Sequence, residues 1–106
     1  MRESKYQADL RKRIENLLPG CLILKNDPTS LQGVPDLLIL HNDRWAMLEV
    51  KVSEHAPTQP NQPYYVDRLA SMSFASFIYP EIEEDVLNEL QLAFRTRRKT
   101  RVSQPK

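Results

Sequence analysis

The sequence has little cysteine and no long apolar run. Its one cysteine, Cys21, has no partner within the chain, which excludes the small scaffolds that disulfides hold together. No stretch approaches the roughly 20 apolar residues of a membrane span, and charges interrupt the N-terminal residues, so we expect neither an anchor nor a signal peptide. A chain of 106 residues suffices for one domain with one core. We therefore expect a soluble, cytoplasmic protein with no membrane partner.

Basic charge is scarce along most of the chain and concentrated at its end. From Arg95 onward there are six basic residues and no acidic one, whereas the first 94 residues carry nine basic and fourteen acidic groups. The C-terminal stretch has little apolar surface to bury, so we expect a folded domain over residues 1–95 and a flexible basic tail over residues 96–106. Both a solubilising end and an arm that binds phosphate groups fit this composition.

The spacing of apolar residues predicts alternating helices and strands. Steps of three and four predict a first helix, which Pro19-Gly20 ends, and short apolar runs predict strands, two of them joined by a tight turn at Asn42-Asp43. The expected helices cover residues 4–18, 64–72 and 81–94, and the expected strands cover residues 21–24, 36–41, 44–52 and 74–79. This order belongs to the α/β class.

The turn at Asn42-Asp43 fixes the register of the predicted hairpin. With these two residues as the loop, Asp36 lies opposite Glu49, and their Cβ atoms are about 4.5–5.5 Å apart on one face of the sheet. Lys51 lies on the same face, two positions further along. The rest of the hairpin is apolar on both faces, which predicts buried central strands. Two carboxylates in such a place must share a proton or hold a cation.

A divalent metal gives this cluster a chemical purpose. Mg²⁺ takes carboxylate oxygens and keeps waters and substrate phosphate oxygens in its shell, so Asp36 and Glu49 suit metal-assisted hydrolysis of a phosphodiester, with Lys51 assisting the attacking water. The alternative is that Asp36 only begins a strand and that Glu49 and Lys51 face solvent at a sheet edge, because so short a match recurs by chance. The hydrophobic context and the register favour the catalytic interpretation.

The same residues resemble a known nuclease signature. Gly33-Val34-Pro35-Asp36, followed thirteen positions later by Glu49-Val50-Lys51, resembles the PD-(D/E)xK motif, in the form found in small VRR-NUC proteins of bacteria and phages. The resemblance covers roughly residues 1–95. It implies a restriction-endonuclease-like core, with element order α-β-β-β-α-β and a mixed central sheet flanked by helices.

The resemblance also implies roles for individual residues. Asp36, Glu49 and the backbone carbonyl of Val50 would ligate Mg²⁺, for which Mn²⁺ would substitute, and Lys51 would assist the water. The family places a glutamine at a helix start, for which Gln62 is the counterpart here and Gln59 the competitor. It also uses a glutamate of its first helix, for which Glu15 is the candidate. Glu15 fits a surface acid equally well.

The activity that this resemblance implies is Mg²⁺-dependent cleavage of DNA, with branched DNA such as Holliday junctions as substrate and a homodimer as the active form, in a bacterial or phage-infected cell. RNA remains open as a substrate. The alternative is a catalytically silent module that binds nucleic acid or protein through the same fold. The residues expected to hold the nucleic acid are Arg11, Lys12 and Arg13 on the first helix and Arg97, Arg98, Lys99 and Arg101 near the C-terminus.

Overall fold

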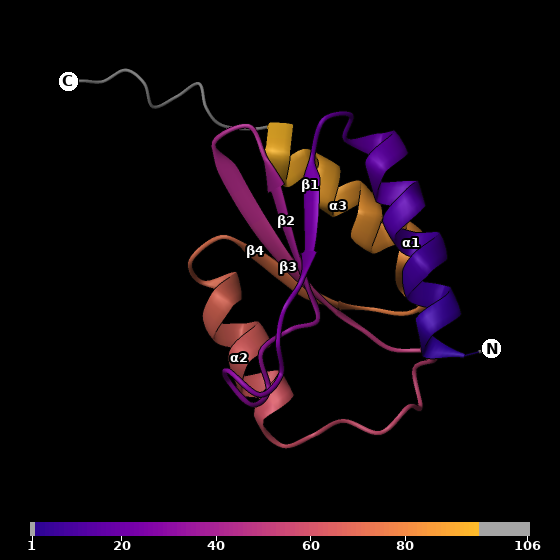
Figure 1. Cartoon of the computed structure of the whole chain (residues 1–106), viewed down its shortest axis with the longest axis vertical. Coiled ribbons are helices and arrows are strands. Elements are labelled where there is room, and N and C mark those ends of the chain that lie inside the picture. Colours follow the sequence, from indigo (N-terminus) through magenta and orange to yellow (C-terminus); the bar gives the residue numbers. More distant parts are fainter. Residues whose placement is uncertain (1, 96–106) are drawn as a thin grey trace.

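A mixed four-stranded sheet organises residues 2–95, the part of the chain that the computed structural model describes (Figure 1). The sheet order is β1-β2-β3-β4, antiparallel throughout except for the parallel pair of β3 and β4. The elements are α1 (Glu3–Leu17), β1 (Leu22–Lys25), β2 (Leu37–His41), β3 (Arg44–Val50), α2 (Asn61–Ala70), β4 (Phe74–Ile78), the 3-10 helix η1 (Pro80–Ile82) and α3 (Glu83–Arg95). The expected α-β-β-β-α-β order is confirmed.

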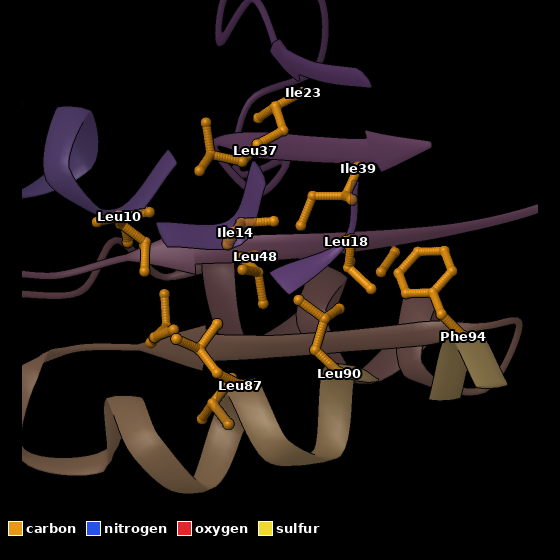
Figure 2. Packing of buried hydrophobic residues seen from close by; sticks show 14 of the residues in the cluster. Leu10, Ile14, Leu18, Ile23, Leu37, Ile39, Leu48, Leu87, Leu90 and Phe94 are labelled. Carbon is orange, nitrogen blue, oxygen red and sulfur yellow. The ribbon is translucent and has the colours of Figure 1, made fainter. Parts of the chain in front are cut away.

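The hydrophobic core lies between one face of the sheet and the helices α1 and α3. Leu10 and Ile14 of α1 and Leu87 and Leu90 of α3 are almost fully buried, and they pack with Leu37, Ile39 and Leu48 of the central strands (Figure 2). Burying one such side chain contributes roughly 1.5–3 kcal/mol. This shared core holds α1 and the start of β2 in fixed positions, which matters for the site described below.

The opposite face of the sheet is only partly covered, because α2 contacts β3 and β4. Leu22 and Leu24 of the edge strand β1 are 61% and 47% exposed. The side chains of the central strands on this face are only half-buried: Leu38, Leu40, Trp45 and Met47. The prediction that both faces of the hairpin are buried is therefore right for the α1 and α3 face and wrong for this one.

Several element boundaries differ from those predicted from sequence. The α2 helix begins at Asn61 rather than at residue 64, because Pro63 falls in its first turn, where a missing N–H costs no hydrogen bond. Strand β3 ends at Val50, and the last helix is preceded by a separate 3-10 turn. The tight turn between β2 and β3 is as predicted, with Asn42 in the left-handed region at φ 57°. No helix of residues 2–95 has the length and apolar composition needed to cross a bilayer.

Candidate active site

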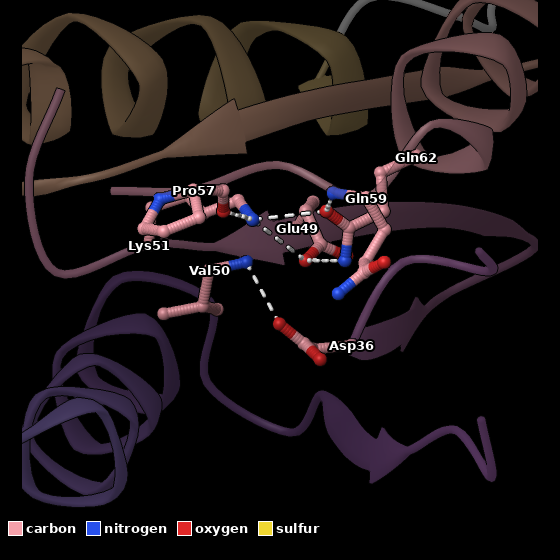
Figure 3. A network of polar contacts seen from close by, with 7 residues as sticks. All are labelled: Asp36, Glu49, Val50, Lys51, Pro57, Gln59 and Gln62. Atoms are coloured by element: carbon pink, nitrogen blue, oxygen red, sulfur yellow. Dashed lines mark hydrogen bonds and ion pairs between the residues drawn. The ribbon is translucent and has the colours of Figure 1, made fainter. Parts of the chain in front are cut away.

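Asp36 and Glu49 meet where β2 begins and β3 ends. The observed pairing of Leu37 with Leu48 and of His41 with Arg44 is the predicted register, and its extension by one residue sets Asp36 opposite Glu49. Asp36 Oδ2 accepts a hydrogen bond of 3.0 Å from the backbone N–H of Val50, next to Glu49 (Figure 3). The structure thus brings the two acids to one end of the hairpin, on adjacent strands.

Glu49 is a buried carboxyl group, and only one of its two oxygens has a hydrogen-bond partner among the described residues. Its residue is 2% exposed, and burial, reinforced by the nearby Asp36 carboxylate, raises its pKa from 4.5 to about 8 against the opposing effect of Lys51. Oε2 accepts a hydrogen bond of 2.8 Å from Gln62 Nε2. Oε1 is buried and has no hydrogen-bond partner among the described residues. A buried acceptor without a donor is costly, so this oxygen is suited to an added cationic partner.

Lys51 lies directly after β3 and is held from several sides. Its backbone N–H donates to the carbonyl of Ile78, which continues the pairing of β3 with β4, and its residue is 8% exposed. Nζ donates to the carbonyl of Pro57 at 2.7 Å and to Gln62 Oε1 at 2.9 Å, and lies 3.9 Å from Glu49 Oε2. The ammonium group is therefore fixed beside the carboxylates.

Gln62 is the glutamine that lies in this network. From the first turn of α2 its Nε2 donates to Glu49, and its Oε1 accepts from both Lys51 Nζ and the backbone N–H of Gln59 at 2.9 Å (Figure 3). The contribution of Gln59 is this backbone group, and its residue is exposed. Of the two glutamines that the sequence left open, the structure places the side chain of Gln62, the expected counterpart, in the network.

The loop before β2 positions both Asp36 and α2. Asn26 anchors it, since its backbone N–H donates to the Asp36 carbonyl and its Nδ2 to the Pro35 carbonyl, each at 2.8 Å. Gly33 has φ 95°, and a Cβ atom there would lie 2.4 Å from Asn61 Cβ, at the start of α2. The glycine of the Gly-Val-Pro-Asp motif therefore serves a close contact between the loop and the helix that carries Gln62.

The structure does not bring Glu15 to the carboxylates, contrary to the expectation from sequence. Glu15 lies near Cys21. Burial raises the pKa of the Cys21 thiol, and the charge of Glu15 raises it further. Cys21 precedes β1, whereas Lys25, at the other end of that strand, pairs with Leu37 beside Asp36. Glu15 therefore lies at the opposite end of the sheet from the site.

Glu3 is the acid of α1 near the site, and it was missed from sequence. Its charge is among those that raise the pKa of Glu49. At about 1.5 Å per residue, Glu3 lies roughly 18 Å along the helix from Glu15. A signal existed: the short connection at Pro19-Gly20 makes α1 run antiparallel to β1, so the start of α1 lies near the end of β1, which adjoins the start of β2.

The basic residues of α1 have three different surroundings. Arg13 forms ion pairs with Glu83 and Glu84 of α3, and Tyr6 also donates to Glu83, so Arg13 ties two helices together rather than presenting a free cation. Arg11 donates through Nη2 to the carbonyl of Ile23 at 3.2 Å, and Lys12 is exposed. The other expected nucleic-acid contacts, Arg97, Arg98, Lys99 and Arg101, lie outside the described residues.

A metal at this site would depend on few protein ligands. Within residues 2–95 no group of three or more His, Cys, Asp or Glu side chains is arranged to hold a metal ion. Two carboxylates are present, one of them with the unpartnered oxygen Oε1 of Glu49, and the Val50 carbonyl is adjacent in sequence. These hard oxygen donors fit Mg²⁺, which keeps several waters in its shell and does not need a full protein cage.

Comparison with known proteins agrees with this architecture. No protein-family model and no curated protein matches the chain. Among solved structures, one described as "VRR_NUC domain" has a TM-score of 0.64 and 26% sequence identity, covering 84% of this chain and 94% of its own. A second, "VRR_NUC domain protein", has a TM-score of 0.55 and 15% identity, covering 83% and 87%. The chain therefore has a nuclease-family fold with a restriction-endonuclease-like core, and the resemblance to VRR-NUC proteins seen in its sequence is confirmed by its structural similarity to these domains.

Proposed function

We propose that this protein is a Mg²⁺-dependent endonuclease that hydrolyses phosphodiester bonds of DNA. The observation that carries the proposal is the buried, unpartnered Oε1 of Glu49 beside the Asp36 carboxylate, with a fixed ammonium group next to them. Buried charges of this kind cost stability, and replacing them with apolar side chains would remove that cost. The arrangement therefore does not serve to stabilise the fold. A site that takes up a cation and a phosphate group explains it.

Each residue of the network has a distinct task in this proposal. Asp36, Glu49 and the Val50 carbonyl would hold Mg²⁺, and the negative charge of Glu3, which acts on Glu49, would add to the attraction of the cation. Bound Mg²⁺ would supply Lewis-acid activation of the phosphoryl group and of a water molecule. Lys51 holds a positive charge where negative charge develops on the phosphoryl oxygens. Gln62 orients both Lys51 and Glu49 through its two polar atoms.

The finer part of the proposal concerns substrate and assembly. We propose branched DNA as the substrate, Mn²⁺ as a substitute metal, a homodimer as the active form, and the cytoplasm as its location. A symmetric dimer suits a four-way junction because two symmetric cuts need two sites. The exposed Leu22 and Leu24, on the sheet face that α2 leaves open, supply apolar surface for such a contact.

The test is cleavage of a matched set of labelled DNA substrates. Purified protein is incubated with a four-way junction, a flap, a duplex and a single strand, with Mg²⁺, with Mn²⁺ and with EDTA. We expect metal-dependent cutting, strongest on the branched forms. Asp36→Asn should abolish it, whereas Asp43→Asn, the same change at the exposed hairpin turn, should leave it intact.

Two outcomes would contradict the proposal. Cleavage that persists unchanged in Asp36→Asn would come from a contaminating nuclease. A structure-specific band shift with no cutting in either metal would instead support the silent binding module.

A further inference from the structure

A charged groove runs along α1 beside the edge strand β1. It has a volume of about 680 Å³, and the charged and amide side chains of its lining are Glu3, Gln7, Arg11, Lys12, Glu15 and Lys25. The three cations lie between an acid at each end, and Glu3 to Glu15 spans roughly 18 Å of helix. The groove thus carries its three positive charges between two acids.

One end of this groove lies near the carboxylate site. Its first acid, Glu3, is the α1 residue whose charge acts on Glu49. Lys25 pairs with Leu37, and the next residue, Asn26, donates to the backbone carbonyl of Asp36 at 2.8 Å. A ligand whose reacting group lies at the carboxylates can therefore extend directly into the groove.

The groove offers hydrogen-bond donors that the fold leaves in part unused. Gln7 is 6% exposed, and its Oε1 accepts a long 3.4 Å bond from Lys25 Nζ, while its Nε2 has no partner among the described residues. Within residues 2–95 Lys25 forms no ion pair with a carboxylate. An accessible amide N–H without a partner and an ammonium group without a carboxylate are able to bind phosphate and sugar oxygens.

A second hollow near the site has the opposite charge balance. It lies between α2 and β4, has a volume of about 470 Å³, and is lined by one cation, Lys51, together with the acids Glu54 and Asp67. Its other walls are largely apolar. A polyanionic backbone therefore finds complementary charge along α1 and not along α2.

We propose that the α1 groove binds the sugar-phosphate backbone of the DNA strand that is cut, with Lys25 and Gln7 contacting the phosphates next to the scissile one and Arg11 and Lys12 contacting those further away. This inference rests on the proposed nuclease function and adds to it the path of the strand. It assigns binding roles to Lys25 and Gln7 and none to Arg13, which α3 engages.

The first test measures binding without cleavage. Fluorescence anisotropy in EDTA compares the full chain with Lys25→Gln and Gln7→Leu, using a labelled four-way junction and a labelled single strand. We expect Lys25→Gln to weaken binding several-fold at low salt and to lower the slope of log K against log salt by about 0.7–0.9. Lys5→Gln makes the same charge change on an exposed face of α1, where Lys5 pairs with Asp9, and should leave both quantities unchanged.

The second test locates the contact on the DNA. Neutral methylphosphonate groups replace single phosphates at successive positions on each side of the mapped cut. We expect one or two positions on one side of the cut to weaken binding by the unmodified protein and to have no further effect on Lys25→Gln, because the two changes remove the same contact. Melting temperatures of all variants confirm that they are folded.

The outcomes separate this inference from the function on which it rests. If the unmodified protein cuts DNA with Mg²⁺ while Lys25→Gln and Gln7→Leu bind as Lys5→Gln does, the strand takes another path and the inference is wrong. If Lys25→Gln binds weakly but methylphosphonate interference is unchanged in this variant, the effect of Lys25 is not a phosphate contact, which also overturns it. Absence of any cutting would instead contradict the proposed function.

Discussion

The two ends of the β2–β3 hairpin share one register, but they differ in how fully the polar side chains there find partners within the fold. At the turn end, the His41 ring packs edge-on against Phe94 with centroids 5.6 Å apart, and Arg44 donates to the Ala93 carbonyl at 3.3 Å. At the other end, Glu49 and Lys51 are buried, and Glu49 Oε1 has no partner among the described residues. Because the strands are the same, the difference arises from the residues placed at each end.

This difference separates what stabilises the fold from what serves a ligand. Contacts at the turn end tie the hairpin to α3 and are complete without any added molecule. Contacts at the carboxylate end place like charges on adjacent strands in a buried position, which costs stability. Strain of this kind typically collects at functional sites. Substitutions at the carboxylate end should therefore lower activity more than stability, and substitutions at the turn end should lower stability more than activity.

After Asp36→Asn, the largest effect is expected from Lys51→Met, which keeps the length of the side chain and removes its charge. We expect DNA cleavage with Mg²⁺ to fall by about 10²–10⁴-fold, because the ammonium group beside the carboxylates is lost. The measurement is the single-turnover cleavage rate on the preferred substrate. A rate within a factor of two of the unmodified protein would show that Lys51 only fills space.

Gly33→Ala should disturb the site through the loop. The residue has φ 95°, and a Cβ atom would clash with Asn61 at the start of α2, so we expect a loss of about 1–3 kcal/mol in the free energy of unfolding. Urea denaturation measures this. Gly20→Ala is the matched control, since Gly20 also has positive φ, 90°, but nothing lies within 4 Å of an added Cβ. Equal losses in the two variants would contradict a role for the contact with α2.

Glu49 should make stability depend on pH in the absence of metal. Its folded pKa of about 8 exceeds the ordinary 4.5, so the folded chain binds a proton that the unfolded chain does not, and stability falls as pH rises from about 4.5 to 8. We expect the melting temperature in EDTA to drop by several degrees over this interval, since about 1 kcal/mol corresponds to about 4–8 °C. Mg²⁺ should reduce the drop at pH 8.

The control for this titration is Glu49→Gln, which cannot ionise. We expect its melting temperature to vary less with pH and not to respond to Mg²⁺. A drop of the same size in Glu49→Gln would assign the titration to other groups.

The smallest effect is expected at the turn end, from His41→Ala. Loss of the edge-on contact with Phe94 should cost about 0.5–1.5 kcal/mol and leave the cleavage rate unchanged. Thermal denaturation and the same cleavage assay give both values. A large loss of activity would mean that the two ends are coupled and that the contrast between them is false.

The hairpin register could be predicted from the sequence because the register depends on local features. A two-residue turn at Asn42-Asp43 and side chains that alternate between faces are enough to set Asp36 opposite Glu49. The register in turn indicated where the acids meet. The closeness of Lys51 to Glu49 follows from the same alternation.

Features that depend on packing between distant segments were harder to predict. The half-open face of the sheet follows from where α2 docks, and no periodicity in the strands reports this. Glu15 was named as the candidate of the first helix and Glu3 was not considered, because the direction of α1 relative to β1 was not used. Arg13 was expected to be free because its partners, Glu83 and Glu84, lie about seventy residues away in the chain.

The side-chain amide of Gln62 has one end that only donates and one that only accepts, and neither end titrates near neutral pH. Its nitrogen donates to Glu49 Oε2 and its oxygen accepts from Lys51 Nζ, so one side chain satisfies a carboxyl oxygen and an ammonium group at the same time. A carboxylate in its place would attract the lysine but repel Glu49. The amide thus holds Glu49 and Lys51 in place even while Glu49, whose pKa burial raises to about 8, carries its proton, so a cation that displaces this proton meets a carboxyl group that is already oriented.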